Sequence, residues 1–545
     1  MQVPSAPAAV LEPPSGPPSG RRSQPAGRPA PPALAAASGA VAVMALLPAL
    51  YLVVRAAGGD PAAVVRQALD SRTLALLARS CGLAAAVTAS STLIAVPAAW
   101  LTVRTDLPGR RTWAVLTALP LVIPSYVGGY AFVAAFGPRG VAQQWLSGLG
   151  VERLPSIYGF AGAWGVLTLF TYPYVLMTVR SAMRGLDPSV EEAARSLGRR
   201  SFIRVTLPQL RPAIASGALL VALYALHDFG AVSLLRFDSF TRVIYQQYQS
   251  SFDRRSAAIL SLVLVAVTLA VVTAEGRTRT RARYYRAHSG AARRAPVTAL
   301  GRWRWPAFAA CGLLVLAALV VPVGIVGYWF VRGMASGESA GFTLGAAAGS
   351  LQASALGAVA ALVAAWPVAL LSARHPGRFA GVVERSSFVG YALPGVVVAL
   401  SLVFLGTRLV PALYQTRAML TFAYVVLFLP QAVGALRASL LQVPPEVEDA
   451  ARSLGSSPMT VMRRVVAPMV RPGALTALAL VFLTVMKELP ATLLLSPIGF
   501  QTLATRVWGA TSEAFFARAA APALALVALS SAPLAYLVFR ESRRR

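Results

Sequence analysis

The chain has 545 residues, of which 56% are hydrophobic and only 13% are charged, and its mean hydropathy is +0.63. Soluble domains carry about 25% charged residues, so this composition excludes an ordinary soluble enzyme and indicates an integral membrane protein. The formal net charge is +30, and arginine carries nearly all of it because Lys487 is the single lysine. The arginines lie between apolar runs, which is typical of loops retained in the cytoplasm and argues against nucleic acid as a partner.

Residues 1–37 are rich in proline, serine, glycine and alanine, so we predict a disordered cytoplasmic tail there. Apolar runs long enough to cross a bilayer follow in two sets of six. They lie near 38–56, 80–103, 113–136, 158–180, 212–235 and 256–274, and near 306–331, 348–372, 386–407, 419–436, 470–496 and 519–539. The predicted fold is an all-α integral membrane protein with about twelve transmembrane helices in two homologous six-helix halves.

Segment 275–305 separates the two sets of runs. It contains nine arginines against the single acid Glu275, so we predict an arginine-rich linker that stays in the cytoplasm. Six spans precede it, and both chain termini are therefore expected to be cytoplasmic. The first half is predicted to cover residues 38–274 and the second half residues 306–545.

A polar segment that occurs twice is the clearest motif. Residues 180–198 and 437–455 agree at ten of nineteen positions without a gap, which indicates an internal duplication. Each copy contains an acid, two alanines and a glycine: Glu192, Ala193, Ala194 and Gly198 in the first, and Asp449, Ala450, Ala451 and Gly455 in the second. Paired alanines let a helix approach a partner closely, and the glycine permits a turn with positive φ. An amphipathic helix at the membrane surface without a partner is the alternative.

These two segments resemble the EAA loop of ABC importer permeases. In that family the loop forms a helix, a turn and a helix that fit a groove on the ATPase subunit. The resemblance implies a type I ABC importer permease fold, with loops at 184–212 and 441–472 and an ATPase-coupling role for the eight residues named above. It also implies two copies of an ABC ATPase subunit as partners.

Nucleotide chemistry is not predicted for this chain itself. A P-loop needs a Gly-Lys-Ser/Thr sequence, and the only lysine lies between Met486 and Glu488. We therefore expect a permease subunit that is not an enzyme and binds no cofactor, with ATP used by the partner subunit. The three histidines show no metal-ligand spacing, so no metal site is predicted.

The stretch Lys487–Leu495, KELPATLLL, resembles the corresponding part of ferric-iron ABC permeases, as does HDFGAV at residues 227–232. This resemblance implies a fused permease of a bacterial inner membrane that receives ferric iron from an extracytoplasmic binding protein. Permeases for thiamine, polyamines, phosphonates or sulfate share the architecture and remain alternatives. A secondary transporter of twelve spans is a more distant one, and it would leave the paired segments unexplained.

Asp228 and Glu488 fall at the same position when the halves are aligned through Pro208 and Pro468. Ionisable groups inside a span are costly and usually face a cavity or a partner. Both residues are therefore candidates for the permeation pathway. The alternative is a structural hydrogen bond that locks two helices together.

Overall fold

The computed structural model describes residues 30–58, 61–138, 140–186, 202–250, 254–279, 297–338 and 341–543. Throughout these ranges the chain is helical apart from loops, turns and one isolated β-bridge. Here η marks a 3₁₀ or π segment. The first half contains α1 (Pro32–Ala57), α2 (Pro61–Ala68), α3 (Ser71–Arg104), α4 (Arg110–Leu116), η1 (Leu119–Val122), α5 (Ser125–Phe136), α6 (Val141–Ser147), α7 (Phe160–Arg184), η2 (Phe202–Thr206), α9 (Leu207–His227), α10 (Gly230–Leu234), α11 (Phe240–Ser250) and α12 (Arg254–Arg279).

The second half repeats this order of long and short helices. It contains η3 (Gly301–Trp303), α13 (Arg304–Val315), η4 (Leu316–Val320), α14 (Val321–Ala335), α15 (Gly341–Arg374), α16 (Arg378–Ser387), η5 (Phe388–Ala392), α17 (Gly395–Leu409), η6 (Pro411–Leu413), α18 (Arg417–Leu440), α19 (Pro445–Ser453), α20 (Pro458–Val461), η7 (Met462–Val466), α21 (Ala467–Met486), α22 (Pro490–Leu495), α23 (Leu503–Ser512) and α24 (Phe516–Arg543).

The helices match the predicted spans closely. In the described part of the chain, nine helices are long and apolar enough to cross a membrane, and two bent pairs raise that number to eleven. A shorter apolar helix, Phe516–Ser531 within α24, lies at the position of the twelfth predicted span. The all-α membrane fold is thus confirmed.

Four of the predicted spans are not continuous helices. Those at 113–136 and 386–407 bend by 94° and 105°, where the extended prolines Pro124 and Pro394 precede α5 and α17. A proline removes a backbone donor, and a helix that meets one commonly breaks or kinks. The spans at 212–235 and 470–496 end early, at His227 and Met486, and short helices α10 and α22 follow.

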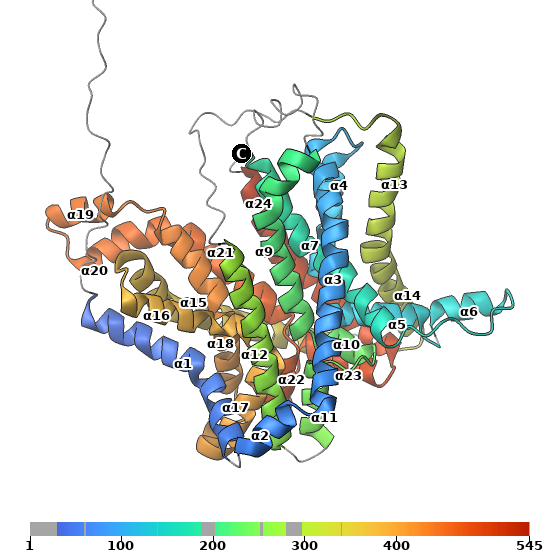
Figure 1. Cartoon of the computed structure of the whole chain (residues 1–545), viewed down its shortest axis with the longest axis horizontal. Helices are drawn as coiled ribbons and strands as arrows, with labels where there is room; N and C mark the ends of the chain where they lie inside the picture. Colours follow the sequence, from blue (N-terminus) through green and yellow to red (C-terminus); the bar gives the residue numbers. More distant parts are fainter. Residues whose placement is uncertain are drawn as a thin grey trace, which may run out of the picture.

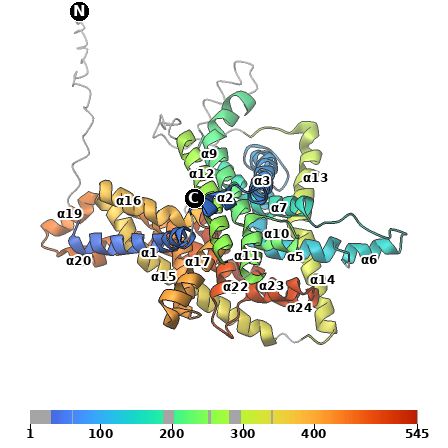
Figure 2. The same cartoon turned by 60° about the horizontal axis from the view of Figure 1, so that its bottom comes forward.

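The first span of each half packs against the other half. In Figures 1 and 2, α1 lies beside α15, α16 and α17, away from α3 and α7. The Ser401 hydroxyl donates to the Pro48 carbonyl at 2.7 Å, and the Tyr51 hydroxyl donates to the Phe404 carbonyl at 3.2 Å. Helix α14 packs against α5 of the first half as well as α24 of its own half, and Phe308 of α13 contacts Trp113 of α4, with ring centroids 5.0 Å apart. The apolar core is therefore shared between the halves, while the domain boundaries given above stay a prediction.

The molecule has two ends, the repeat side and the far side. The repeat side carries α19 and the C-terminal ends of α3 and α15, and α19 and α4 lie toward the top of Figure 1. The far side carries the N-terminal ends of α3 and α15 with α11 and α23. On the repeat side, Thr298 pairs with Thr105 and the Asp106 carboxylate accepts from the Leu300 N–H at 2.8 Å, which anchors the described end of the linker to the first half.

The predicted tail lies outside the described residues up to position 29, and so does segment 280–296 of the predicted linker. Helix α1 begins at Pro32, so the last six residues of the predicted tail, 32–37, are helical.

Candidate functional site

The second copy of the repeated segment forms a short helix on the repeat side. Helix α19 begins at Pro445. Proline has no backbone N–H, and at the first position of a helix an N–H would have no acceptor within the helix, so proline is favoured there. Glu446 and Glu448 lie in that first turn, where negative charge favours the helix N-terminus. Asp449, Ala450 and Ala451 follow within the helix, so the predicted motif lies on one short element.

Gly455 ends this helix in the way that its residue type suggests. Its φ is +81°, its N–H donates to the Arg452 carbonyl at 2.9 Å, and the Ser456 N–H donates to the Ala451 carbonyl at 3.2 Å. These two bonds and the left-handed residue define a Schellman cap. The predicted positive φ is confirmed for this glycine, and Ser457 then caps α20.

The surface around this turn is apolar and open. Leu454 is 87% exposed and Met459 is 67% exposed, and Val447 and Ala450 are exposed as well. Apolar side chains gathered on one exposed turn are a common mark of a protein interaction surface. We call Val447, Ala450, Leu454 and Met459 the α19 surface; its role in ATPase coupling stays a prediction.

A buried ion pair holds α19 to a transmembrane helix. The Arg374 Nη2 atom lies 2.7 Å from Glu448 Oε1, and it also donates to the Val443 carbonyl at 3.0 Å. The two side chains are 12% and 9% exposed. Arg452 lies against the outer side of the same helix, 3.4 Å from Glu448 and 3.2 Å from Asp449. The position of α19 is therefore tied to the C-terminal end of α15.

The first copy of the motif lies outside the described residues, so Glu192, Ala193, Ala194 and Gly198 are not placed. The structure does describe its flanks. Arg104 at the end of α3 donates to the Met183 carbonyl of α7 at 2.9 Å, at the place where Arg374 acts in the second half. After both copies a π segment, η2 or η7, leads into the long helix α9 or α21.

Asp228 caps a short helix at the end of α9. Its Oδ1 atom accepts hydrogen bonds from the N–H groups of Ala231 (3.0 Å) and Val232 (3.2 Å), which belong to the first turn of α10. Its Oδ2 atom accepts a hydrogen bond from the Ser125 hydroxyl. The residue is 7% exposed. Asp228 thus joins the break after α9 to the break before α5, and this geometry supports the structural alternative for it.

Glu488 occupies the equivalent place after α21. Its Oε1 atom accepts from the Ala491 N–H at 3.1 Å in α22, and the Thr492 hydroxyl donates to its carbonyl at 2.8 Å. Gly395 is the equivalent of Ser125 in the second half, and a Cβ added to it would lie 2.6 Å from Glu488 Oε1. The glutamate side chain, which is longer than that of Asp228, therefore fills the place that the Ser125 side chain takes in the first half. Unlike Asp228, Glu488 is only half-buried.

Lys487 connects the second carboxylate site to the first half. Its Nζ atom donates to the Leu121 carbonyl in η1 at 2.8 Å. Sequence reasoning placed Lys487 beside Glu488 but did not predict this contact, nor the pairing of Arg374 with Glu448. Ser125 and Gly395 were also missed, although both directly follow a proline at the aligned breaks in the two halves.

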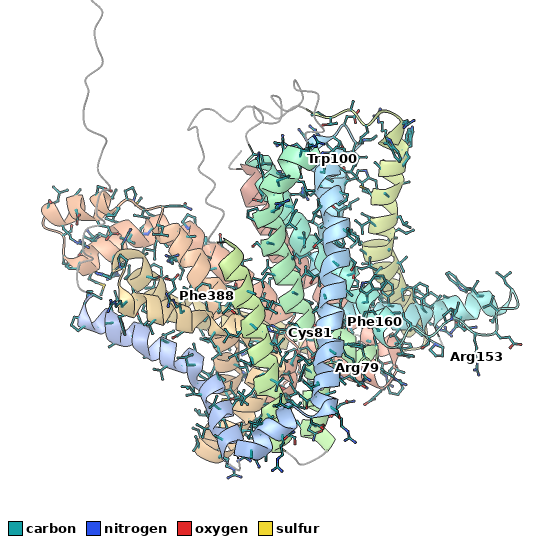
Figure 3. All side chains as sticks on the ribbon, viewed as in Figure 1. Arg79, Cys81, Trp100, Arg153, Phe160 and Phe388 are labelled. Carbon is teal, nitrogen blue, oxygen red and sulfur yellow. The ribbon has the colours of Figure 1, made fainter. Side chains whose placement is uncertain are left out.

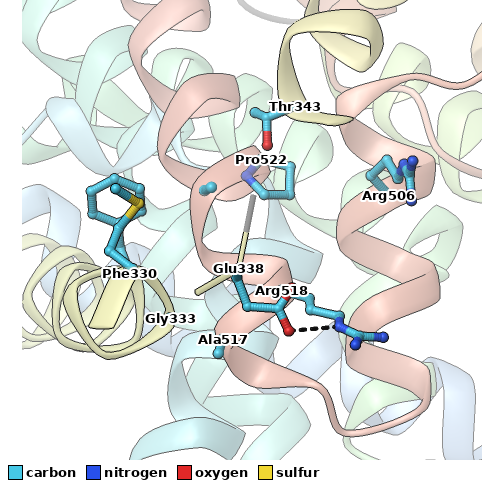
Figure 4. A pocket seen from close by; sticks show the side chains of 10 residues that line it. Phe330, Gly333, Glu338, Thr343, Arg506, Ala517, Arg518 and Pro522 are labelled. Atoms are coloured by element: carbon cyan, nitrogen blue, oxygen red, sulfur yellow. Dashed lines mark hydrogen bonds and ion pairs between the residues drawn. The ribbon is translucent and has the colours of Figure 1, made fainter. Parts of the chain in front are cut away.

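A pocket of about 320 Å³ opens on the far side between α14 and α24 (Figure 4). Phe330 and Pro522 line its apolar part, and Arg506 lies across from them. Arg518 and Glu338 form an ion pair there at 2.8 Å, with side chains 58% and 38% exposed. Exposed pairs of this kind contribute about 0–1 kcal/mol. The pocket belongs to the second half alone and is separate from α19.

Potential metal ligands do not gather in this structure. Within the ranges described above, no group of three or more His, Cys, Asp or Glu side chains could hold a metal ion.

Two related halves, each built from apolar helices long enough to cross a membrane, define a helical integral membrane protein. The chain belongs to the family described as the inner membrane component of binding-protein-dependent transport systems, which matches residues 91–336 and 357–543. The double match fits the duplication seen in the sequence and the fold.

Individual relatives agree with this family. The chain is 34% identical over 494 residues to "Fe(3+)-transport system permease protein FbpB 2" of Haemophilus influenzae, covering 90% of this chain and 94% of the relative. It is 30% identical to "Sulfate transport system permease protein CysW" of Synechocystis, covering 34% of this chain and 71% of that relative. It is 32% identical to "Molybdenum transport system permease protein ModB" of Escherichia coli, covering 31% and 78% respectively.

Proposed function

We propose that this chain is the fused transmembrane subunit of an ATP-driven importer that moves ferric iron across a bacterial inner membrane. The similarity to the ferric-iron permease over 90% of the chain carries this proposal, because it spans both halves. An extracytoplasmic binding protein delivers the substrate to the far side. Both chain termini and the repeat side face the cytoplasm, as the arginine-rich linker favours.

ATP hydrolysis is assigned to a partner subunit. The sequence has no P-loop, and the α19 surface offers exposed apolar side chains on a rigidly capped turn. Two copies of the motif indicate two ATPase copies, one on Glu192, Ala193, Ala194 and Gly198 and the other on Asp449, Ala450, Ala451 and Gly455. The purified chain should hydrolyse no ATP until the nucleotide-binding subunit is added, and it should then capture two copies. Stoichiometric hydrolysis by the chain alone would refute this assignment.

An oxyanion is the second candidate substrate, because relatives named for sulfate and molybdenum transport match parts of the chain. Uptake of radioactive iron, sulfate and molybdate by cells with and without the gene separates the candidates. We expect the deletion to lower iron uptake and leave the two oxyanions unchanged. A loss confined to sulfate or molybdate would transfer the proposal to that substrate. A loss confined to thiamine, a polyamine or a phosphonate would identify that compound as the substrate instead.

A further inference from the structure

Each half contains one helix of 34 residues that reaches from the repeat side to the far side: α3 in the first half and α15 in the second. Arg104 is the last residue of α3 and Arg374 is the last residue of α15. Each arginine donates to a backbone carbonyl in the first part of a copy of the repeated segment, at Met183 and Val443 respectively. Arg374 also holds Glu448 of α19.

The far-side ends of the same two helices make another matching pair of contacts. The Ser80 hydroxyl of α3 accepts a hydrogen bond from the Phe240 N–H at 3.1 Å, and the Ser350 hydroxyl of α15 accepts one from the Leu503 N–H at 2.8 Å. Phe240 and Leu503 are the first residues of α11 and α23. The first N–H groups of a helix have no acceptor within that helix, so each serine satisfies a donor that would otherwise be orphaned.

The two serines occupy equivalent positions. Both are buried, at 5% and 2% exposure, and each precedes its arginine by 24 residues. At 1.5 Å per residue this separation is about 36 Å, which exceeds the roughly 30 Å hydrocarbon thickness of a bilayer. Figure 3 labels two residues that lie far apart along α3. Arg79 directly precedes Ser80, and Trp100 lies near the repeat side. The same long-range connection therefore occurs twice in one chain.

Neighbouring contacts strengthen the far-side attachment in different ways. A Cβ on Gly349 would lie 2.2 Å from the Gln501 carbonyl, so α15 passes very close to the residues before α23. In the first half Arg79 lies 3.9 Å from Asp238, just before α11. Different residues thus serve the same purpose beside each serine.

We propose that α3 and α15 connect the repeated segments to the far-side helices, and that Ser80 and Ser350 are positioning residues that fix α11 and α23 to them. This inference rests on the proposed function and specifies how the repeat side and the far side of the transporter are coupled. When an ATPase displaces α19, Arg374 carries the displacement into α15, and Ser350 carries it to α23. In the reverse direction, a binding protein that contacts the far side alters the ATPase through the same contacts.

The test uses the complete transporter, reconstituted in lipid vesicles with its ATPase subunit and its binding protein loaded with Fe(III). The measurement is ATP hydrolysis with and without that binding protein. In Ser80→Ala and Ser350→Ala variants we expect normal assembly and basal hydrolysis, but stimulation reduced about fivefold for each serine, the scale set by one lost buried hydrogen bond. Threonine at either position keeps a hydroxyl acceptor and should retain more of the stimulation.

Ser372→Ala is the matched control, because within the described part of the chain the hydroxyl of this buried serine of α15 donates to the Val368 and Ala369 carbonyls of its own helix. Gly349→Ala is an independent variant that keeps Ser350 but forces α15 away from Gln501, and it should reduce stimulation as well. Full stimulation in the Ser80→Ala, Ser350→Ala double variant would overturn the inference while leaving the proposed function intact. A wild-type transporter without any stimulation would overturn both.

Discussion

Lys487 Nζ lies 2.8 Å from the carbonyl oxygen of Leu121, and this hydrogen bond joins residues 366 positions apart in the two halves. Leu121 belongs to η1, just before the break that Pro124 introduces. Lys487 in turn follows the last residue of α21. The contact therefore connects a break in one half to a break in the other.

Replacing Lys487 with methionine should destabilise the assembled protein. Methionine keeps much of the side-chain volume but removes the donor, and the part-buried Leu121 carbonyl loses its partner, which costs about 1–3 kcal/mol when such a group is fully buried. We expect a lower thermal unfolding midpoint, measured by fluorescence in detergent. Lys487→Arg retains a donor and is the control. Equal melting of the methionine variant and the wild type would show that the contact contributes nothing.

Valine at position 455 should abolish uptake without preventing membrane insertion. Gly455 has a φ of +81°, and a β-branched residue is strongly disfavoured there. The added side chain meets no atom within 4 Å, so the effect comes from the backbone and disturbs the α19 surface. Gly381→Val is the control, because that glycine also has open space around its Cβ position but lies inside α16. Unchanged uptake in the Gly455→Val variant would count against the docking role.

Glutamine at position 448 should lower stability and weaken capture of the ATPase. The change leaves the Arg374 side chain, which is only 12% exposed, without its anion, and breaking a buried pair costs about 3–5 kcal/mol. Glu338→Gln breaks a more exposed pair with Arg518 and should cost about 0–1 kcal/mol. The thermal midpoints and a pull-down with the ATPase subunit give the comparison. Similar midpoints for the two variants would disprove the anchoring role of Glu448.

Neutralising the two aligned carboxylates should have different effects. Asp228→Asn disturbs a buried carboxylate that accepts three hydrogen bonds, so we expect a lower melting temperature. Glu488 is half-buried and caps one N–H group, so Glu488→Gln should slow iron uptake while the melting temperature holds. Iron uptake and melting are measured on the same preparations. Normal uptake in both variants would remove the pathway role from both residues.

The sequence was sufficient for the positions and order of the apolar segments, because hydropathy reports directly on burial in lipid. It could not show that two of these spans bend by about a right angle at Pro124 and Pro394. Hydropathy depends only on which residues are present, and a bent span has the same hydropathy as a straight one. Alignment of the halves correctly placed Asp228 and Glu488 at equivalent points.

The partners of those carboxylates could not be predicted in the same way. A serine or glycine after a proline has many possible roles, and only the fold brings Ser125 to Asp228 and Gly395 to Glu488. The same holds for Arg374, whose ion pair with Glu448 joins residues far apart in sequence. The turn at Gly455 was predictable because its requirement is local.

The position of α1 has a consequence for how the protein is made. Helix α1 packs against α12 of its own half, yet α15, α16 and α17, which form much of the surface around it, are synthesised some 300 residues later. At about 5–20 residues per second, this delay lasts tens of seconds. During that time Ser401 is not available to the Pro48 carbonyl, and α1 must wait in the bilayer beside temporary neighbours. Synthesis of the second half therefore completes the folding of the first span.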